Sequence, residues 1–340
     1  MNEDHGGGCN GGSIRVILAL AAGSWGLAAC SDSGAPSMLD PAGPGARRIE
    51  GLWWLMFWIS LAVFAVVLLL LLISLLRARR NSNAIHRVAW GEPFIVVAGV
   101  VVPAFILAGV FLVSLREMNA LASYGEDARL TIEVIGHDWW WEVRYPNGAV
   151  TANEIHIPAA EPVRLELTTD DVLHSFWVPE LQAKTDMING RTNRMWIEAD
   201  EAGRFRGQCA EFCGLQHANM AFYVIAQERT DFDAWLEKES APAARTTDSG
   251  VNRGEQIFLS STCVGCHAVR GTPADSQVGP DLTHVARRET LAAGTITNTR
   301  ANLAQWVLDP QSIKPGAPMP PTDLSSEELE ALLDYLESLD

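Results

Sequence analysis

The chain has 340 residues, of which 48% are hydrophobic, and its formal net charge is −16. This composition excludes a disordered chain, a collagen-like chain and a nucleic-acid-binding protein, and the length predicts two or more domains. The charge is uneven, since residues 1–115 carry +1, residues 116–240 carry −11 and residues 241–340 carry −6. The acidic part favours a basic soluble partner, although acidic residues also simply keep exposed domains soluble.

Residues 1–29 have the layout of an export signal of the lipoprotein type. An apolar stretch rich in Ala and Gly, too short for a membrane span, begins beside Arg15 and ends in Leu-Ala-Ala-Cys at residues 27–30. That ending resembles a bacterial lipoprotein processing box, and cleavage there would leave Cys30 lipidated outside the membrane. The weakly basic start leaves this modification open. The Gly- and Pro-rich part of residues 30–50 predicts a flexible tether.

Residues 51–116 predict a hairpin of two transmembrane helices. The apolar runs 52–76 and 94–115 contain no charged residue, and each is long enough to cross a hydrocarbon layer of roughly 30 Å. The alternative, two buried core helices, is disfavoured because the first run has no polar face. Four arginines against Glu92 place the intervening loop in the cytoplasm of a bacterial cell. Everything after residue 116 is then expected on the periplasmic or extracellular side.

Residues 117–240 predict an all-β domain. Residues 131–135 and 163–168 alternate apolar and polar side chains with the two-residue period of half-buried strands. Further strand-like runs at 194–198 and 221–226 complete an antiparallel sandwich or small barrel.

The last part of the chain predicts an all-α domain at residues 251–340. Residues 241–250 are rich in Ala, Ser, Thr and Pro and predict a linker before it. Helices are expected at residues 252–260, 303–308 and 325–339. Ser325 and Glu328 form the sequence pattern of a capping box at the start of the last helix.

Residues 263–267 read Cys-Val-Gly-Cys-His, the spacing of covalent haem c attachment. Cys263 and Cys266 can add to the two vinyl groups of a haem, while His267 turns its imidazole toward the iron. Met319, in a proline-rich loop, offers the sixth ligand. A disulfide would leave His267 without a role, and half of a zinc site would lack its second pair of ligands.

A second set of metal-ligand residues consists of Cys209, Cys213, His217 and Met220, with His174 upstream. Soft sulfur ligands beside imidazoles favour copper or zinc over magnesium or calcium. The set is larger than a four-coordinate zinc requires. It suits two copper ions bridged by both sulfurs, with one imidazole for each metal, the thioether on one and a backbone carbonyl on the other. A disulfide is the alternative in an exported domain.

With these motifs, residues 50–228 resemble cytochrome c oxidase subunit II, which has a helical hairpin, a cupredoxin barrel and the dinuclear copper (CuA) motif C-x-E-x-C-x3-H-x2-M. Residues 251–340 resemble a class I cytochrome c, including Val-Gly-Pro-Asp-Leu at 278–282. The whole resembles the variety of subunit II that carries a fused cytochrome c. The resemblance implies that Glu211 lends its main-chain oxygen to copper and its carboxylate to a magnesium ion at the interface with the large subunit.

The resemblance also covers the aromatic run at residues 139–141. It implies that electrons enter the copper domain at Trp139. On a strand, Trp139 and Trp141 would share one face, and at least one of the three tryptophans is expected in the core. The chain departs from the family in its second span, where Val96 and Gly99 replace a Glu and a Trp. Whether Glu92 serves a proton channel instead stays open.

The expected function is that of the electron-accepting subunit of a terminal respiratory oxidase. Electrons would pass from cytochrome c or a quinol-oxidising complex through the fused haem c and CuA to subunit I, where oxygen is reduced to water. Other oxidase subunits and membrane lipid are the further expected partners. An alternative is an electron-transfer module for a system like nitrous oxide reductase, which needs an additional cluster of histidines. A metal-free quinol-oxidase subunit would lack the thiolates, and a copper-delivery protein would not need a haem.

Overall fold

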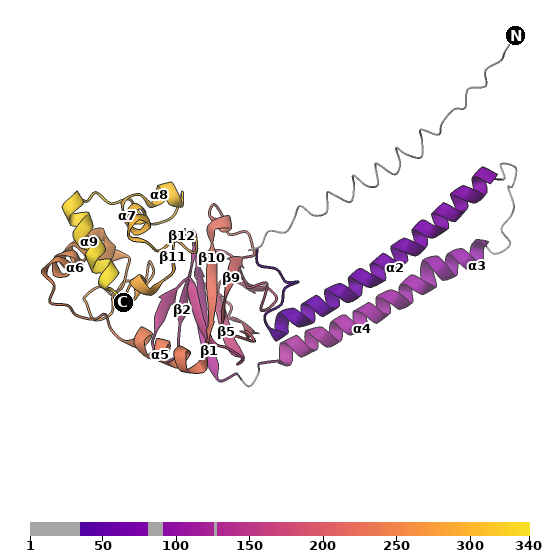
Figure 1. Ribbon diagram of the computed structural model, residues 1–340, viewed down its shortest axis with the longest axis horizontal. Coiled ribbons are helices and arrows are strands. Elements are labelled where there is room, and N and C mark those ends of the chain that lie inside the picture. Colours follow the sequence, from indigo (N-terminus) through magenta and orange to yellow (C-terminus); the bar gives the residue numbers. More distant parts are fainter. Residues whose placement is uncertain (1–34, 81–90, 126–127) are drawn as a thin grey trace, which may run out of the picture. The chain divides into compact units, whose positions relative to one another are not determined.

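The computed structural model describes residues 35–80, 91–125 and 128–340 (Figure 1). Residues 36–340 belong to one compact unit. The predicted export signal and Cys30 lie outside the described residues, as does most of the arginine-containing loop between the two apolar runs.

Two long apolar helices form the predicted hairpin and lie side by side (Figure 1). The first is α2 (Pro44–Arg80), and the second is continuous through α3 (Gly91–Val96), the π-helical turn η2 (Val97–Val101) and α4 (Val102–Ser123). Both are long and apolar enough to cross a membrane, and their apolar spans are not buried by the rest of the protein. The π-helical turn lies just before Pro103, whose ring disturbs the hydrogen bonds of the preceding turn.

The two helices extend beyond the predicted runs. Glu92 lies in the first turn of α3. At the opposite end of the hairpin, Arg48 in α2 forms an ion pair of 3.0 Å with Glu117 in α4. Both residues lie outside the uncharged runs that predicted the spans, which explains why those runs underestimated the helices.

The expectation of a flexible tether is wrong for residues 42–46. The amide of Ala42 donates to the carbonyl of Glu180 at 2.8 Å, and that of Ala46 donates to the carbonyl of Leu181 at 3.0 Å. Ala46 is fully buried. Small residues, which suggested flexibility, instead allow this segment to approach the β-domain closely.

The β-domain is a sandwich of two five-stranded sheets with the orders β3-β2-β1-β5-β8 and β4-β10-β9-β6-β7. Most neighbouring strands are antiparallel, as predicted, but β1 pairs with β5 and β4 with β10 in parallel. The strands are β1 (Leu130–His137), β2 (Trp140–Arg144), β3 (Val150–Ala152), β4 (Glu154–Pro158), β5 (Val163–Thr169), β6 (His174–Trp177), β7 (Thr185–Met187), β8 (Asn193–Ile197), β9 (Gly203–Cys209) and β10 (Ala221–Gln227).

The core of this domain lies between the two sheets. In β5 buried and partly exposed residues alternate without exception, as the predicted strand period requires. Trp141, Phe176 and Phe222 are fully buried and pack on one another, with ring centroids 4.5–6.0 Å apart. Cys209, Cys213 and Met220 belong to the same buried cluster, so these copper-ligand candidates pack directly against the core.

The remainder of the chain is mainly helical, as predicted for residues 251–340, and includes one short two-stranded sheet. Its elements are α5 (Arg229–Ser240), α6 (Ser249–Ser260), η4 (Thr262–Gly265), η5 (Val285–Arg287), β11 (Thr290–Leu291), β12 (Ile296–Thr297), α7 (Arg300–Leu308), α8 (Pro310–Ile313) and α9 (Ser326–Ser338). The capping box is confirmed: Ser325 accepts from the amide of Glu328, and the Glu328 carboxylate accepts from the amide of Ser325.

Two features near the predicted linker differ from expectation. Helix α5 was not predicted, and α6 begins at Ser249, inside residues 241–250. Asp248 caps α6 by accepting from the amides of Gly250 and Val251. The amide of Ala243 donates to the carbonyl of Arg270 at 2.9 Å, so the linker is attached to the haem-motif domain.

Candidate metal centres

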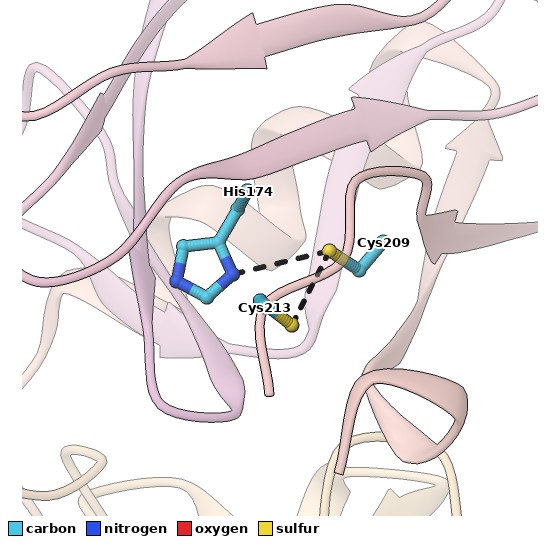
Figure 2. Close-up of side chains that lie close together, drawn as sticks. All are labelled: His174, Cys209 and Cys213. Atoms are coloured by element: carbon cyan, nitrogen blue, oxygen red, sulfur yellow. Dashed lines mark hydrogen bonds between the residues drawn. The ribbon is translucent and has the colours of Figure 1, made fainter. Parts of the chain in front are cut away.

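Three of the copper-ligand candidates, His174, Cys209 and Cys213, lie close together (Figure 2). His174 is the first residue of β6 and Cys209 the last residue of β9, and these two strands pair. The loop after β9 carries Cys213 and the 3-10 helix η3 (His217–Asn219) before it returns to β10. The amide of Cys209 donates to the carbonyl of Met220 at 2.9 Å, which closes the loop.

The sulfurs and imidazoles lie at distances suited to shared metal ions. Cys209 Sγ is 3.7 Å from Cys213 Sγ, far beyond a disulfide bond of about 2.05 Å. His174 Nδ1 lies 3.9 Å from Cys209 Sγ, and His217 Nδ1 lies 3.6 Å from Cys213 Sγ. Two ligand atoms on one tetrahedral metal ion, with bonds of about 2.0–2.3 Å as for zinc, are separated by about 3.5–3.8 Å. The distances therefore fit metal ions between the thiols.

A thioether and a carbonyl complete the set. Met220 Sδ lies 3.8 Å from Cys213 Sγ, and the main-chain oxygen of Glu211 lies 3.2 Å from Cys209 Sγ. Each cysteine sulfur thus has one imidazole and one further donor atom near it. All of the predicted copper ligands of this chain are thus brought together, and their soft donor set fits a copper pair.

Asp171 orients the imidazole of His174. Its Oδ1 accepts from His174 Nε2 at 2.9 Å, which leaves Nδ1 directed at Cys209 (Figure 2). On the other side of the ring, a Cβ added at Gly136 would lie only 2.9 Å from His174 Cδ2. Burial lowers the pKa of His174, but the bonds to Asp171 and Cys209 outweigh it and raise this pKa to about 9.

The two cysteines differ in acidity. The hydrogen bond between the two sulfurs, more than the opposing effect of burial, lowers the pKa of Cys209 and raises that of Cys213. The pair therefore favours an anionic sulfur, the form that binds metal ions.

The three tryptophans have separate roles. Trp141 is fully buried, which confirms that at least one belongs to the core, and Trp140 stacks on His137 with centroids 4.4 Å apart. Trp139 is partly buried and lies in the turn before β2, so it does not share the strand alternation expected for it. Its Nε1 donates to the carbonyl of Cys213 at 2.8 Å, which links it to the copper loop.

The haem motif begins in the 3-10 helix η4 and continues in the turn after it. Cys263 and Cys266 are free and partly exposed. His267 Nδ1 donates to the carbonyl of Pro280 at 2.8 Å, which leaves Nε2 for iron. Burial lowers the pKa of His267 and so favours the neutral imidazole that acts as a ligand. The backbone of Met319 accepts from Gln311 Nε2 at 3.1 Å, which holds its loop.

The carboxylate of Glu211 is half-exposed and forms an ion pair of 3.2 Å with Lys184. Its charge is therefore already balanced within the chain, and a magnesium ion would have to compete with this lysine.

Two histidines and two methionines outside the predicted ligand sets lie in packed positions. His156 is buried and stacks on Trp235 at 3.9 Å, and His284 is also buried. Met187 and Met195 are buried fillers. Two functional residues were missed by the sequence reasoning: Asp171 three positions before a metal-ligand histidine, a spacing that could have revealed it, and a buried lysine considered below.

Comparisons with known proteins assign two parts of the chain to known families. Residues 148–227 match the family model of the periplasmic domain of cytochrome c oxidase subunit II, and residues 251–340 match that of cytochrome c. Cytochrome c oxidase subunit 2 of Alkalihalophilus pseudofirmus is 39% identical over 315 residues, covering 88% of this chain and 90% of the relative. The Bacillus subtilis protein of that name is 33% identical over 353 residues, covering 96% and 97%.

Among solved structures, the chain is similar to the periplasmic domain of subunit II of cytochrome oxidase from Bradyrhizobium japonicum. The two are 32% identical, and the match covers 33% of this chain and 94% of that one with a TM-score of 0.32.

Proposed function

This chain belongs to the cytochrome c oxidase subunit II family, and we propose that it is the subunit through which electrons enter a terminal respiratory oxidase. Electrons would come from cytochrome c or a quinol-oxidising complex. They would pass through haem c and dinuclear CuA to the haem-copper subunit that reduces oxygen to water. Family membership makes the chain a component of the oxidase, with other oxidase subunits as its partners, anchored in a membrane with a periplasmic domain.

The observation that carries the proposal is the convergence of soft ligand atoms on the two facing thiols of Cys209 and Cys213. When bound, the copper pair and haem c would supply one-electron carriers. The chain's own residues would keep the ligands still: Asp171 holds His174, and Trp139 holds the carbonyl of Cys213. A ligand set that is already in place requires little rearrangement when an electron arrives.

The described residues give no support to the alternative function, an electron-transfer module for a system like nitrous oxide reductase. It needs a second cluster of histidines, but the described histidines left after ligand assignment lie in three separate places. His137 is bonded to Glu142, His156 to Gln227, and His284 to the carbonyl of Ala241.

We further propose that both metal-carrying domains lie on the periplasmic side of a bacterial cell membrane, because four arginines, at positions 77, 79, 80 and 87, lie between the two uncharged runs. Lipidation of Cys30 and a magnesium ion at Glu211 are parts of the same proposal. The magnesium ion requires Glu211 to exchange its ion pair with Lys184.

The test is purification of the intact oxidase, followed by copper and haem counting and oxygen uptake with reduced cytochrome c. We expect haem that stays attached to this chain on a denaturing gel, together with a full copper pair in each chain. Cys263→Ala should lose the attached haem and retain the copper pair, whereas Cys213→Ser should retain the haem and keep only one copper ion in place of the pair. A wild-type chain with haem but only one copper ion would contradict the proposal.

A further inference from the structure

Lys314 is a buried lysine between the two candidate metal centres. It follows α8, five positions before Met319, and is only 3% exposed. Its Nζ donates to the carbonyls of Trp139 at 2.7 Å, Asn219 at 2.8 Å and Ala292 at 3.1 Å. The first two carbonyls belong to the copper-ligand domain, and the third belongs to the domain of Lys314 itself. All three N–H donors of the ammonium group are therefore used.

This burial is costly for a lysine. The three acceptors of Lys314 are neutral main-chain carbonyls, and an ammonium group removed from water is tolerated only if its donors are satisfied. Burial lowers the pKa of Lys314 to about 7, but three carbonyls require the three N–H donors that only the charged form has. An apolar residue would usually provide equal stability at such a place, so the lysine points to specificity of docking.

The carbonyls that Lys314 binds flank the copper ligands. Asn219 directly precedes Met220, and Trp139 donates through its indole to the carbonyl of Cys213. A second contact lies beside these, because Gln216 in the copper loop donates to the carbonyl of Pro315 at 2.6 Å. The loop that carries Met319 thus rests on the loop that carries the thiols.

The copper-ligand domain makes a reciprocal contact. Glu154 in β4 is 4% exposed, and its Oε1 accepts from the amides of Glu289 at 2.8 Å and Thr290 at 3.3 Å in the haem-motif domain. The amide of Ala221 also donates to the carbonyl of Ala293 at 3.1 Å. Each domain therefore contributes one buried ionisable side chain that forms hydrogen bonds with main-chain groups of the other, which fixes a single docking geometry.

We propose that Lys314 is a positioning residue that seats the haem-carrying domain on the β1–β2 turn at Trp139 and on the copper loop at Asn219. This inference rests on the proposed function. Electrons then pass between two domains in fixed contact, and no search by a tethered domain precedes each transfer.

The test uses the intact oxidase and compares Lys314→Met with Lys238→Met, a substitution of an exposed lysine on α5. A light-driven reductant reduces haem c, and the absorbance of haem and copper then reports transfer between them at several solvent viscosities. In the wild type and in Lys238→Met we expect fast transfer that does not depend on viscosity. In Lys314→Met we expect transfer slowed by about tenfold or more and dependent on viscosity, since two hydrogen bonds from a charged group are lost from the docking contact.

Unchanged haem and copper spectra in Lys314→Met, together with the slowed transfer, would distinguish positioning from damage to either site. If Lys314→Met does not assemble, Lys314→Gln, which retains two N–H donors, takes its place and should show the same change to a smaller degree. Transfer at the wild-type rate in the variant that assembles overturns the inference. A wild-type oxidase without a copper pair would instead overturn the proposed function, so the two failures are distinguishable.

Discussion

Asp171→Asn should weaken copper binding without removing any ligand atom. In the wild type, the Asp171 carboxylate accepts from His174 Nε2 at 2.9 Å and from the amides of Asp138 and Val172 at 2.6 Å each. An asparagine keeps one acceptor oxygen, so its NH2 group must face one of these donors. The imidazole then loses its fixed orientation, or the loop loses an anchor.

The size of the effect follows from the role of such supporting residues. Loss of the partner that orients a metal-bound histidine typically lowers metal affinity by about 10- to 100-fold. Since each factor of ten corresponds to about 1.4 kcal/mol, we expect a loss of about 1.4–2.8 kcal/mol in copper-binding free energy. The assay is a titration of the oxidase with a copper chelator, followed by the near-infrared absorption of the mixed-valence pair.

Asp170→Asn is the matched control, because Asp170 is the neighbouring residue in the same loop and is exposed. It removes the same charge from the chain without touching His174, so its chelator titration should coincide with that of the wild type. Equal copper retention in Asp171→Asn and Asp170→Asn would refute the view that Asp171 holds the ligand in place.

Three other predictions concern the copper loop, a buried histidine and a strained turn. Cys213→Ser should convert the copper pair into a mononuclear site while covalent haem remains, as metal analysis and paramagnetic resonance would report. Burial lowers the pKa of His156 from 6.5 to about 4, so the unfolded chain binds the extra proton. The contribution of neutral His156 to the free energy of unfolding is therefore present above pH 6.5, and this free energy should fall by about 2 kcal/mol between there and pH 5. Denaturant unfolding of His156→Leu should not show this dependence on pH. Ala292 has a φ of 53° and Gly294 a φ of 74°. Ala292→Gly should raise the free energy of unfolding of the haem-carrying domain by about 1 kcal/mol, and Gly294→Ala should lower it by at least as much. Thermal unfolding measures both changes, and two changes of the same sign would contradict the strain argument.

Most of the candidate site could be predicted because its ligands are close in the sequence. The spacing from Cys209 to Met220 is set within one loop, and the haem motif is contiguous at residues 263–267. His174 is distant in the sequence, and it reaches the loop because Phe176 in β6 pairs with Cys209 in β9. Its chemistry could be recognised from the residue type, but its position depends on sheet register.

The unpredicted features depend on contacts between distant segments. Strand β6 is only four residues long and shows no alternation of buried and exposed positions, so periodicity could not reveal it. The small residues at 42–46 have the composition of a tether, yet they pack on the carbonyls of Glu180 and Leu181. Lys314 resembles any surface lysine in the sequence, and only the docking of two domains buries it.

Paramagnetic resonance of the oxidised, purified oxidase tests the central claim most directly, because the spectrum reports how many copper nuclei share the unpaired electron. If Cys209 and Cys213 bridge a copper pair, the electron should be spread equally over two nuclei, and the signal should vanish on reduction. A signal from a single copper nucleus, or a silent centre in which the two sulfurs form a disulfide, would contradict the account.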